Sequence, residues 1–197
     1  MNNQIFNHKV IDFVPFLKDR LTNLLLQMDG STTRTIAALV GGTITINIKH
    51  QEIIQYNELP GEIQSYFSGE GPFLHRVSSL KYQGDCLSDN AVFADINSLS
   101  AELREKIYQG QIPLGLLIAA LEYRRQFLEC AQMKLDELQP LFTPVHLSSG
   151  ELPVKKYLVI GDRRCCFNIC EIFHLEKLLR YFLDFPSLES EELKSKT

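Results

Sequence analysis

The chain has 197 residues, of which 45% are hydrophobic and 22% are charged, and its formal net charge is −4 at pH 7. These values are typical of a soluble globular protein, and we expect one domain over residues 1–185 and a charged tail over 186–197. Without a long basic run, the chain gives no reason to expect nucleic acid or an anionic membrane surface as a partner. No apolar run approaches the roughly 20 residues of a membrane span, and the N-terminus lacks the pattern of a secretory signal, so we expect a cytoplasmic protein.

The first forty residues predict two helices. Residues 10–28 carry an apolar stripe at helical spacing, from Phe13 to Leu25, with Pro15 suited to the first turn. Asp29-Gly30 supplies a stop, and TRTIAALV (33–40) offers a second helix start.

Strand-like segments follow. TITINIK (43–49) alternates and is rich in β-branched residues, and EIIQYN (52–57) follows a short polar break, which together predict a hairpin. Residues 59–72, punctuated by Pro and Gly, predict a loop with one helical turn. FLHRVSSLKY (73–82) and CLSDNAVFADI (86–96) predict two more strands around a polar turn.

The middle of the chain predicts two short helices and one ambiguous segment. Ser98 or Ser100 can cap a helix that ends at Gly110, and Pro113 can open a second one. Residues 121–133 mix helix formers with residues typical of strands, and propensity alone favours a helix.

The C-terminal part predicts a hairpin from VKKYLVI (154–160) and RRCCFNICEIF (163–173), then an amphipathic helix over 174–185. The links between strands are too short for repeated βαβ crossovers. The element order therefore predicts a single α+β domain with a mostly antiparallel sheet.

The five cysteines predict buried, reduced thiols rather than a metal site. An odd number without a secretory signal favours a reducing compartment. On a regular strand Cys165 and Cys166 point to opposite faces, while Cys166 and Cys170 share a face about 13 Å apart, too far for one zinc ion. No CxxC or HExxH spacing occurs, so we expect neither a metal nor a cofactor.

Two charges stand in apolar strands. Alternation places Glu171 on the face of Cys165, Phe167, Ile169 and Phe173. A buried carboxylate there must be protonated, paired or ligand-facing, and a structural ion pair or a solvated strand end is the simpler alternative. Arg76 poses the same question in FLHRVSSL, with exposure as its simpler alternative; near Glu171 it would complete a pocket that binds a carboxylate.

A third candidate site is the corner DGSTTRT (29–35). It combines hydroxyls and free backbone N–H groups before a helix, which suits an anionic group. Ordinary helix capping explains the same residues equally well.

Four motifs in this order resemble the chorismate lyase (chorismate pyruvate-lyase) family across about residues 20–175. They are DGSTTR (29–34) before TITINIKHQEI (43–53), LHRVSSL (74–80), PLG (113–115) before YRRQFLEC (123–130), and RRCCFNICEIFHL (163–175). The chain is closer to the divergent branch that carries a GTLTR-like turn.

The resemblance implies an antiparallel sheet of about six strands with helices packed against it, a strand over 122–131 and a buried, flap-covered cavity. The implied reaction converts chorismate to 4-hydroxybenzoate and pyruvate, for quinone biosynthesis, without metal or cofactor. Glu171 would be the catalytic acid or base, Arg76 would hold a carboxylate, and backbone donors at Ser31 or Thr32 and at Leu114 would hold substrate oxygens.

The chain also departs from the family pattern. A small polar residue, Ser31 or Thr32, stands where the turn often has a large apolar one, Lys156 replaces an expected arginine, and residues 132–152 are longer and more polar. The alternative is a non-catalytic domain that binds aromatic carboxylates, as in the ligand-sensing modules of some transcription regulators. Those modules follow a DNA-binding segment, for which the roughly ten residues before the first expected helix leave no room.

Overall fold

The computed structural model describes residues 3–119, 123–161 and 164–183, with the backbone alone over residues 3–13. In chain order its elements are α1 (Asn3–Gln27), α2 (Thr32–Val40), β1 (Thr45–Ile54), the 3-10 turn η1 (Tyr56–Glu58), α3 (Gly61–Gln64), β2 (Phe73–Tyr82), β3 (Asp85–Asp95), the 3-10 turn η2 (Ile96–Ser98), α4 (Ala101–Gln109), α5 (Leu114–Ile118), β4 (Arg124–Lys134), α6 (Leu135–Phe142), β5 (Glu151–Gly161), β6 (Arg164–Phe173) and α7 (Leu175–Leu183).

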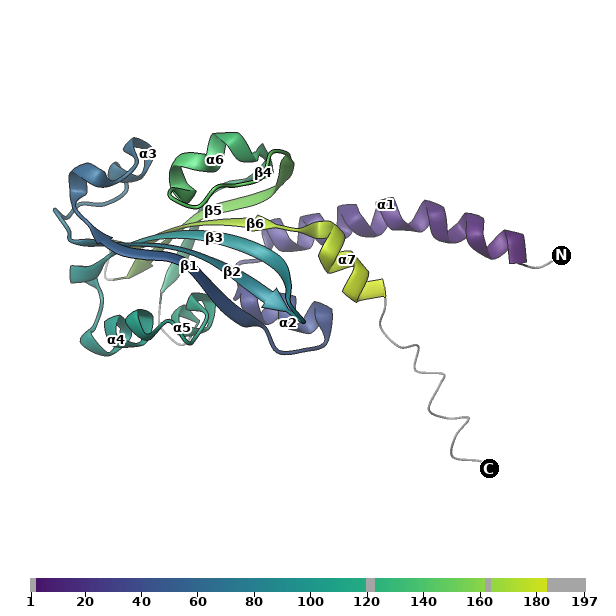
Figure 1. The fold of residues 1–197 in the computed structure, drawn as a ribbon, viewed down its shortest axis with the longest axis horizontal. Coiled ribbons are helices and arrows are strands. Elements are labelled where there is room, and N and C mark those ends of the chain that lie inside the picture. The colour runs from purple at the N-terminus through teal and green to yellow at the C-terminus, as the bar shows by residue number, and fades with distance from the viewer. Residues whose placement is uncertain (1–2, 120–122, 162–163, 184–197) are drawn as a thin grey trace, which may run out of the picture.

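The strands form one open, six-stranded sheet in the order β1-β2-β3-β6-β5-β4 (Figure 1). Every neighbouring pair is antiparallel, so two three-stranded meanders meet where β3 pairs with β6. The expectation of an α+β domain with about six antiparallel strands is therefore confirmed.

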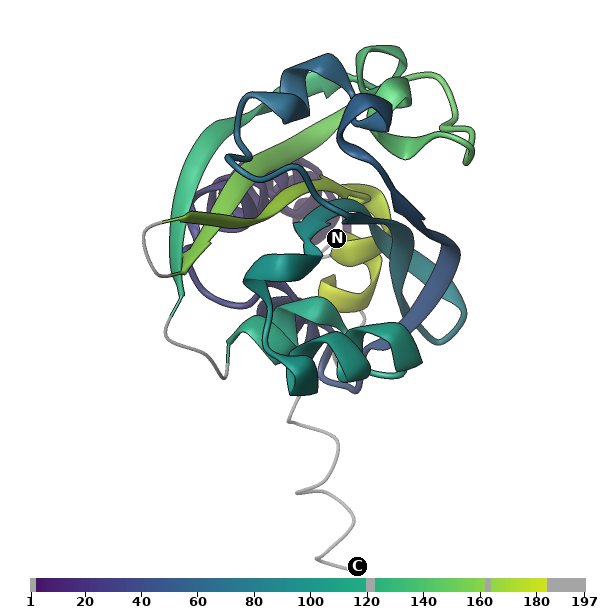
Figure 2. The same cartoon turned by 90° about the vertical axis from the view of Figure 1, so that its left-hand side faces the viewer.

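Helices cover both faces of this sheet (Figures 1 and 2). On one face, side chains of α3 and α6 pack against β-strand residues such as Phe73 and Val77. On the other face, α4 and α5 pack against residues such as Leu74 and Val92. A third cluster joins α1, α2 and α7 at one end, where Leu25 and Leu178 are fully buried.

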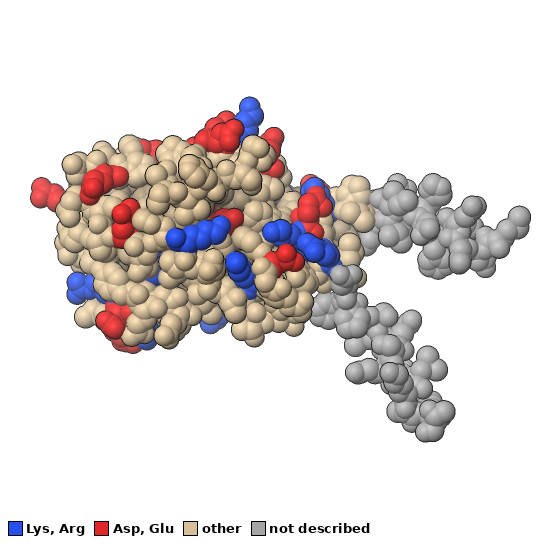
Figure 3. All heavy atoms as spheres, in the orientation of Figure 1, with Lys and Arg blue, Asp and Glu red and all other residues tan. Residues whose placement is uncertain are grey.

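None of the helices in the described ranges combines the length and apolarity that a bilayer span needs. Lysine and arginine side chains lie scattered among aspartate and glutamate side chains on the face drawn in Figure 3.

Two expectations for the first half of the chain are wrong. Helix α1 begins at Asn3 rather than near residue 10, so Pro15 lies inside it and removes one N–H donor from the ladder. Residues 43–57 contain one strand, β1 (Thr45–Ile54), and the start of η1 rather than a hairpin. A bulge between Ile48 and His50 absorbs the polar break, because the extra residue restores the pairing with β2.

Most other boundaries are confirmed. The strands around Gln83-Gly84-Asp85 pair as expected, Ser100 caps α4, and Gly110 ends α4 with a φ of 67°. The ambiguous segment is strand β4, as the resemblance implied and against its helical propensity. Residues 120–122, the turn residue Asp162, the helix end at 184–185 and the tail over 186–197 lie outside the described residues.

The cysteine faces differ from regular alternation. A second bulge, where Ile160 pairs with Cys165 and Val159 with Phe167, puts Cys165 on the α6 side of the sheet, away from Phe167 and Ile169. Cys166 and Cys170 consequently face opposite sides rather than one side. All five cysteines are free; two are buried, whereas Cys130 on the edge strand β4 is exposed rather than buried.

Candidate active site

The four motifs that carry the family resemblance meet at a small cavity between the sheet and helices α2 and α5. Its lining comprises Thr33, Ile46, Ser78, Leu80, Asn90, Val92, Leu114, Gly115, Tyr157, Ile169 and Glu171. The centres of water molecules can occupy about 30 Å³ of this space, which is room for a few waters. Of the residues expected in a site, Glu171 and Leu114 line the cavity directly.

The cavity floor is a row of polar side chains across the central strands. Ser78 on β2 pairs with Asn90 on β3, and Asn90 pairs with Glu171 on β6. Lys155 on β5 completes the row as the register partner of Glu171. All four residues are at most 7% exposed. Because cross-strand partners point to the same face, the sheet itself brings these polar groups together.

Glu171 is held by a lysine and a hydroxyl. The Nζ of Lys155 lies 3.2 Å from Oε2 of Glu171, and the Thr32 hydroxyl donates a 2.7 Å hydrogen bond to the same oxygen. Lys155 also donates to the Leu25 carbonyl oxygen at 3.2 Å, near the end of α1. Glu171 is therefore both ion-paired and cavity-facing, two of the states expected for a buried carboxylate.

Part of the turn before α2 serves as an ordinary helix N-cap. Ser31 is the N-cap residue, and its hydroxyl accepts from the Arg34 N–H at 3.4 Å. The corner packs closely on α5, because a Cβ on Gly115 would lie 3.0 Å from Oγ1 of Thr33. Thus the Ser/Thr turn and the PLG motif share one contact, beside Thr32 and Glu171.

Arg76 lies on the same sheet face but one register row further along β2. Its strand partner Val92 lines the cavity, whereas Arg76 is not among the lining residues. Arg76 is 1% exposed; its Nε donates to Oε1 of Gln51 at 2.7 Å and its Nη2 donates to the Ile107 carbonyl oxygen.

The remaining guanidinium nitrogen of Arg76, Nη1, is buried and meets no hydrogen-bond partner among the described residues. Burial lowers the pKa of Arg76 to about 10, so the side chain stays charged at neutral pH. A buried, charged side chain with one free NH₂ group suits an anionic ligand.

Several residues in or beside the cavity were not identified from the sequence. Lys155, Tyr157 and Asn90 belong to none of the four motifs, although the hairpin register could have paired Lys155 with Glu171. Ser78 lies in LHRVSSL but was not singled out. Burial, and then the nearby charge of Glu171, raise the pKa of Tyr157 well above its ordinary value. The phenol therefore stays protonated and can donate a hydrogen bond to a ligand.

The sheet topology, the helices on both faces and the buried polar cavity define a single α+β domain with a chorismate-lyase-like fold. The model of the family described as Chorismate pyruvate-lyase Rv2949c-like matches residues 26–182, most of the chain, and the chain belongs to this family. No match was found among the curated proteins.

This chain is similar to two solved structures, of which the first supports the fold. The effector domain of PhnF from Mycobacterium smegmatis aligns with a TM-score of 0.51 and 12% identity, covering 74% of this chain and 89% of that one. The C-terminal domain of the histidine utilization repressor from Pseudomonas syringae pv. tomato str. DC3000 aligns with a TM-score of 0.46 and 11% identity, covering 66% and 90%. At such identities the likeness concerns the fold alone.

Proposed function

We propose that this protein is a chorismate lyase, which eliminates pyruvate from chorismate to give 4-hydroxybenzoate without a cofactor. The observation that carries the proposal is the cavity in which Glu171 meets residues of all four family motifs. The free Nη1 of Arg76 on the same sheet face supports it further, because chorismate carries two carboxylates.

Glu171 is the proposed acid and base. In this proposal the carboxylate, paired with the Lys155 ammonium group at 3.2 Å, removes the ring proton next to the breaking C–O bond. The C–O electron pair then leaves with enolpyruvate while the ring becomes aromatic. The proton held by Glu171 passes to the leaving enolpyruvate, which becomes pyruvate, so the carboxylate is regenerated and no proton is gained or lost.

Binding groups surround that carboxylate. Arg76 holds a substrate carboxylate through its free N–H group, and backbone donors at Ser31 or Thr32 and at Leu114 hold further oxygens. The cavity has room for only a few waters, so we infer that α5 moves away from the sheet when substrate enters.

The test is incubation of the purified protein with chorismate, followed by chromatography for 4-hydroxybenzoate. We expect Glu171→Gln and Arg76→Ala each to lower the rate at least about tenfold, the scale of a lost acid-base group or charge clamp. Matched controls are Glu129→Gln, which removes a half-exposed carboxylate that pairs with Lys156, and Arg164→Ala, which removes an exposed arginine at the start of β6. Absence of product above the uncatalysed background would overturn the lyase proposal.

A second candidate is a domain that binds an aromatic carboxylate without turnover. It is favoured by the fold shared with the PhnF effector domain. Tight 4-hydroxybenzoate binding by calorimetry, weakened by Arg76→Ala, together with no turnover of chorismate, would establish this candidate in place of the lyase.

A further inference from the structure

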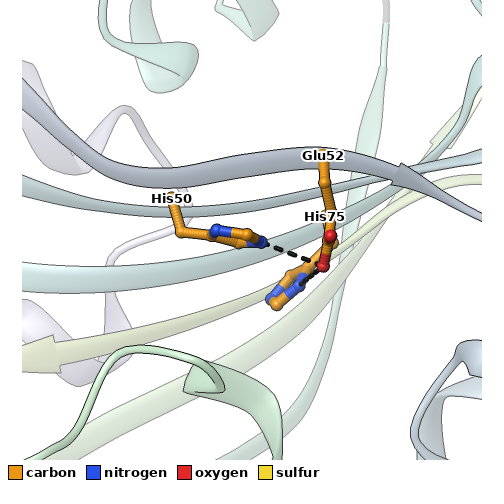
Figure 4. Close-up of side chains that lie close together, drawn as sticks. All are labelled: His50, Glu52 and His75. Atoms are coloured by element: carbon orange, nitrogen blue, oxygen red, sulfur yellow. Dashed lines mark ion pairs between the residues drawn. The ribbon is translucent and has the colours of Figure 1, made fainter.

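A second cluster of ionisable side chains lies on the opposite face of the sheet from the candidate active site. His50 and Glu52 stand two residues apart on β1, and Glu52 pairs in register with His75 on β2 (Figure 4). The side chains of His50, Glu52 and His75 are 21%, 48% and 6% exposed. One ligand atom from each lies within 4.8 Å of the others.

The spacing of these atoms suits one metal ion. His50 Nε2 lies 2.9 Å and His75 Nδ1 lies 3.8 Å from Oε1 of Glu52. Ligand atoms about 2.1 Å from a tetrahedral zinc ion lie roughly 3.4 Å from one another, between these two distances. Two histidines and one glutamate are also a ligand set of catalytic zinc sites, which keep a further position open.

His75 is already oriented as a metal ligand. Its Nε2 lies 3.0 Å from the Leu141 carbonyl oxygen, which accepts only if Nε2 carries the proton. Its ring also stacks on Phe93, with ring centroids 4.5 Å apart and planes 2° from parallel. A backbone carbonyl bound to the other ring nitrogen is the usual partner of a metal-ligating histidine.

This tautomer leaves two acceptors facing each other. With the Nε2 proton donated to the Leu141 carbonyl oxygen, the lone pair of Nδ1 in the neutral ring faces the Glu52 carboxylate at 3.8 Å. His50 Nε2 lies at ion-pair distance, 2.9 Å, from the same Glu52 oxygen (Figure 4), but without the geometry of a hydrogen bond. A cation between the three side chains would satisfy all of them at once.

An open cleft adjoins the cluster. Glu52 and His75 line it together with Glu58, Pro140 and Thr143, and the centres of water molecules can occupy about 440 Å³ of it. The described residues that line this cleft include a second carboxylate but no lysine or arginine. Its charge therefore favours a cation, and its size leaves room for an exchangeable ligand on the ion.

A second group of potential metal ligands within the described part of the chain, Cys86, Asp89 and His174, is different. There Asp89 accepts from Lys49 at 2.7 Å and from Ser79 at 2.5 Å, and it lies 2.8 Å from His174 Nε2. Its charge is already neutralised, and the ammonium group of Lys49 repels a second cation.

We propose that His50, Glu52 and His75 form a site for a divalent first-row transition metal of the zinc class, with an open coordination position toward the cleft beside α6. His50 Nε2, His75 Nδ1 and the Glu52 carboxylate are the ligands. The site is separate from the Glu171 cavity and independent of the lyase proposal.

The test uses tag-free, full-length protein freed of metal by a chelator and titrated with Zn²⁺ by calorimetry. We expect one Zn²⁺ per chain, and a Kd raised at least about 100-fold by His50→Gln or by Glu52→Gln, beyond the effect typical of outer-shell partners. Both altered side chains are partly exposed, so the fold is expected to survive, as thermal unfolding would verify. Glu62→Gln is the matched control, since it removes a half-exposed carboxylate that pairs with Lys156 and does not line the cleft, and it should leave the Kd within about threefold.

Cobalt spectroscopy identifies the ligands. Bound Co²⁺ should give visible ligand-field bands without a thiolate charge-transfer band. A thiolate charge-transfer band would show that a cysteine, such as Cys86, binds the metal, and it would overturn the proposal. No Zn²⁺ binding by the wild-type protein, or equal binding by wild type and His50→Gln, would overturn it as well.

Discussion

Lys155 and Glu171 form a buried ion pair between neighbouring strands, with Nζ and Oε2 separated by 3.2 Å. Their side chains are only 2% and 7% exposed. Thr32 donates to the same carboxylate oxygen, and Lys155 donates to the Leu25 carbonyl oxygen, so the pair links the sheet to both α1 and α2. The Glu171 carboxylate, which stands in an otherwise apolar strand, thus has a partner on β5, and the ion pair connects the cavity floor to α1 and α2.

Removing the lysine should therefore destabilise the protein strongly. Lys155→Met leaves Glu171 buried without its cation, and we expect the free energy of unfolding to fall by about 3–5 kcal/mol in urea denaturation at pH 7. The control is Lys156→Met, which removes only contacts of 3.7 Å to the half-exposed Glu62 and Glu129 and should cost at most about 1 kcal/mol. Equal losses for the two variants would contradict a stabilising role of the pair.

Local features such as helix caps could be predicted from the sequence, whereas features that depend on strand register could not. Ser100 and Gly110 mark α4 because capping is a local property. The bulges after Ile48 and before Phe167 are set by pairing with other strands, so alternation alone could not give the faces of Cys165 and Cys166.

The site was predictable to a similar extent. Glu171 was identified as an unusual charge, but Lys155, its register partner, was not. The cluster of His50, Glu52 and His75 was not predicted. His50 and Glu52 are two residues apart, a spacing that places both side chains on one face only in a strand, and His75 comes from the neighbouring strand β2. Strand β4 was identified through family resemblance, since its sequence favours a helix and the neighbouring strand β5 overrides that preference.

A partly buried charge network around Asp89 on β3 predicts a pH dependence of stability. Burial opposes the charged form of His174, but its hydrogen bond with Asp89 prevails and raises the pKa of His174 to about 9. Asp89 is also buried, yet bonds from His174, Lys49 and Ser79 lower the pKa of its carboxyl. His174 thus stabilises the fold fully below its unfolded pKa of about 6.5, and this stabilisation is lost as the pH rises through 9. The contribution of Asp89 is present above about pH 4 and lost on acidification.

We expect the His174 contribution, about 3 kcal/mol, to disappear between pH 6 and pH 10. Urea denaturation at both pH values should show that His174→Gln loses much less stability over this interval than wild type. His146→Gln, which removes an exposed histidine outside the network, should retain the wild-type dependence. An unchanged pH dependence in His174→Gln would refute the assignment.

Gly110 should tolerate no side chain. It ends α4 with a φ of 67°, and a Cβ there would lie 2.4 Å from Cδ1 of Ile48. We expect Gly110→Ala to lower the free energy of unfolding by about 1–2 kcal/mol from the left-handed conformation alone. In an Ile48→Val background, which removes Cδ1, the same loss should remain. Gly61→Ala is the matched control, because nothing lies within 4 Å of its Cβ position, and it should be neutral or slightly stabilising.

The close approach of α5 to the corner before α2 can be tested by a double-mutant cycle. A Cβ on Gly115 would lie 3.0 Å from Oγ1 of Thr33 and 3.4 Å from Oγ of Ser31. Gly115→Ala therefore forces Thr33 to shift, whereas in a Thr33→Ala background that obstacle is gone. We expect the substitution to cost at least about 0.5 kcal/mol more in the wild-type background than in Thr33→Ala, measured by urea denaturation. Additive effects would mean that a methyl group at residue 115 fits between α2 and α5, and that these helices pack less closely than the 3.0 Å approach indicates.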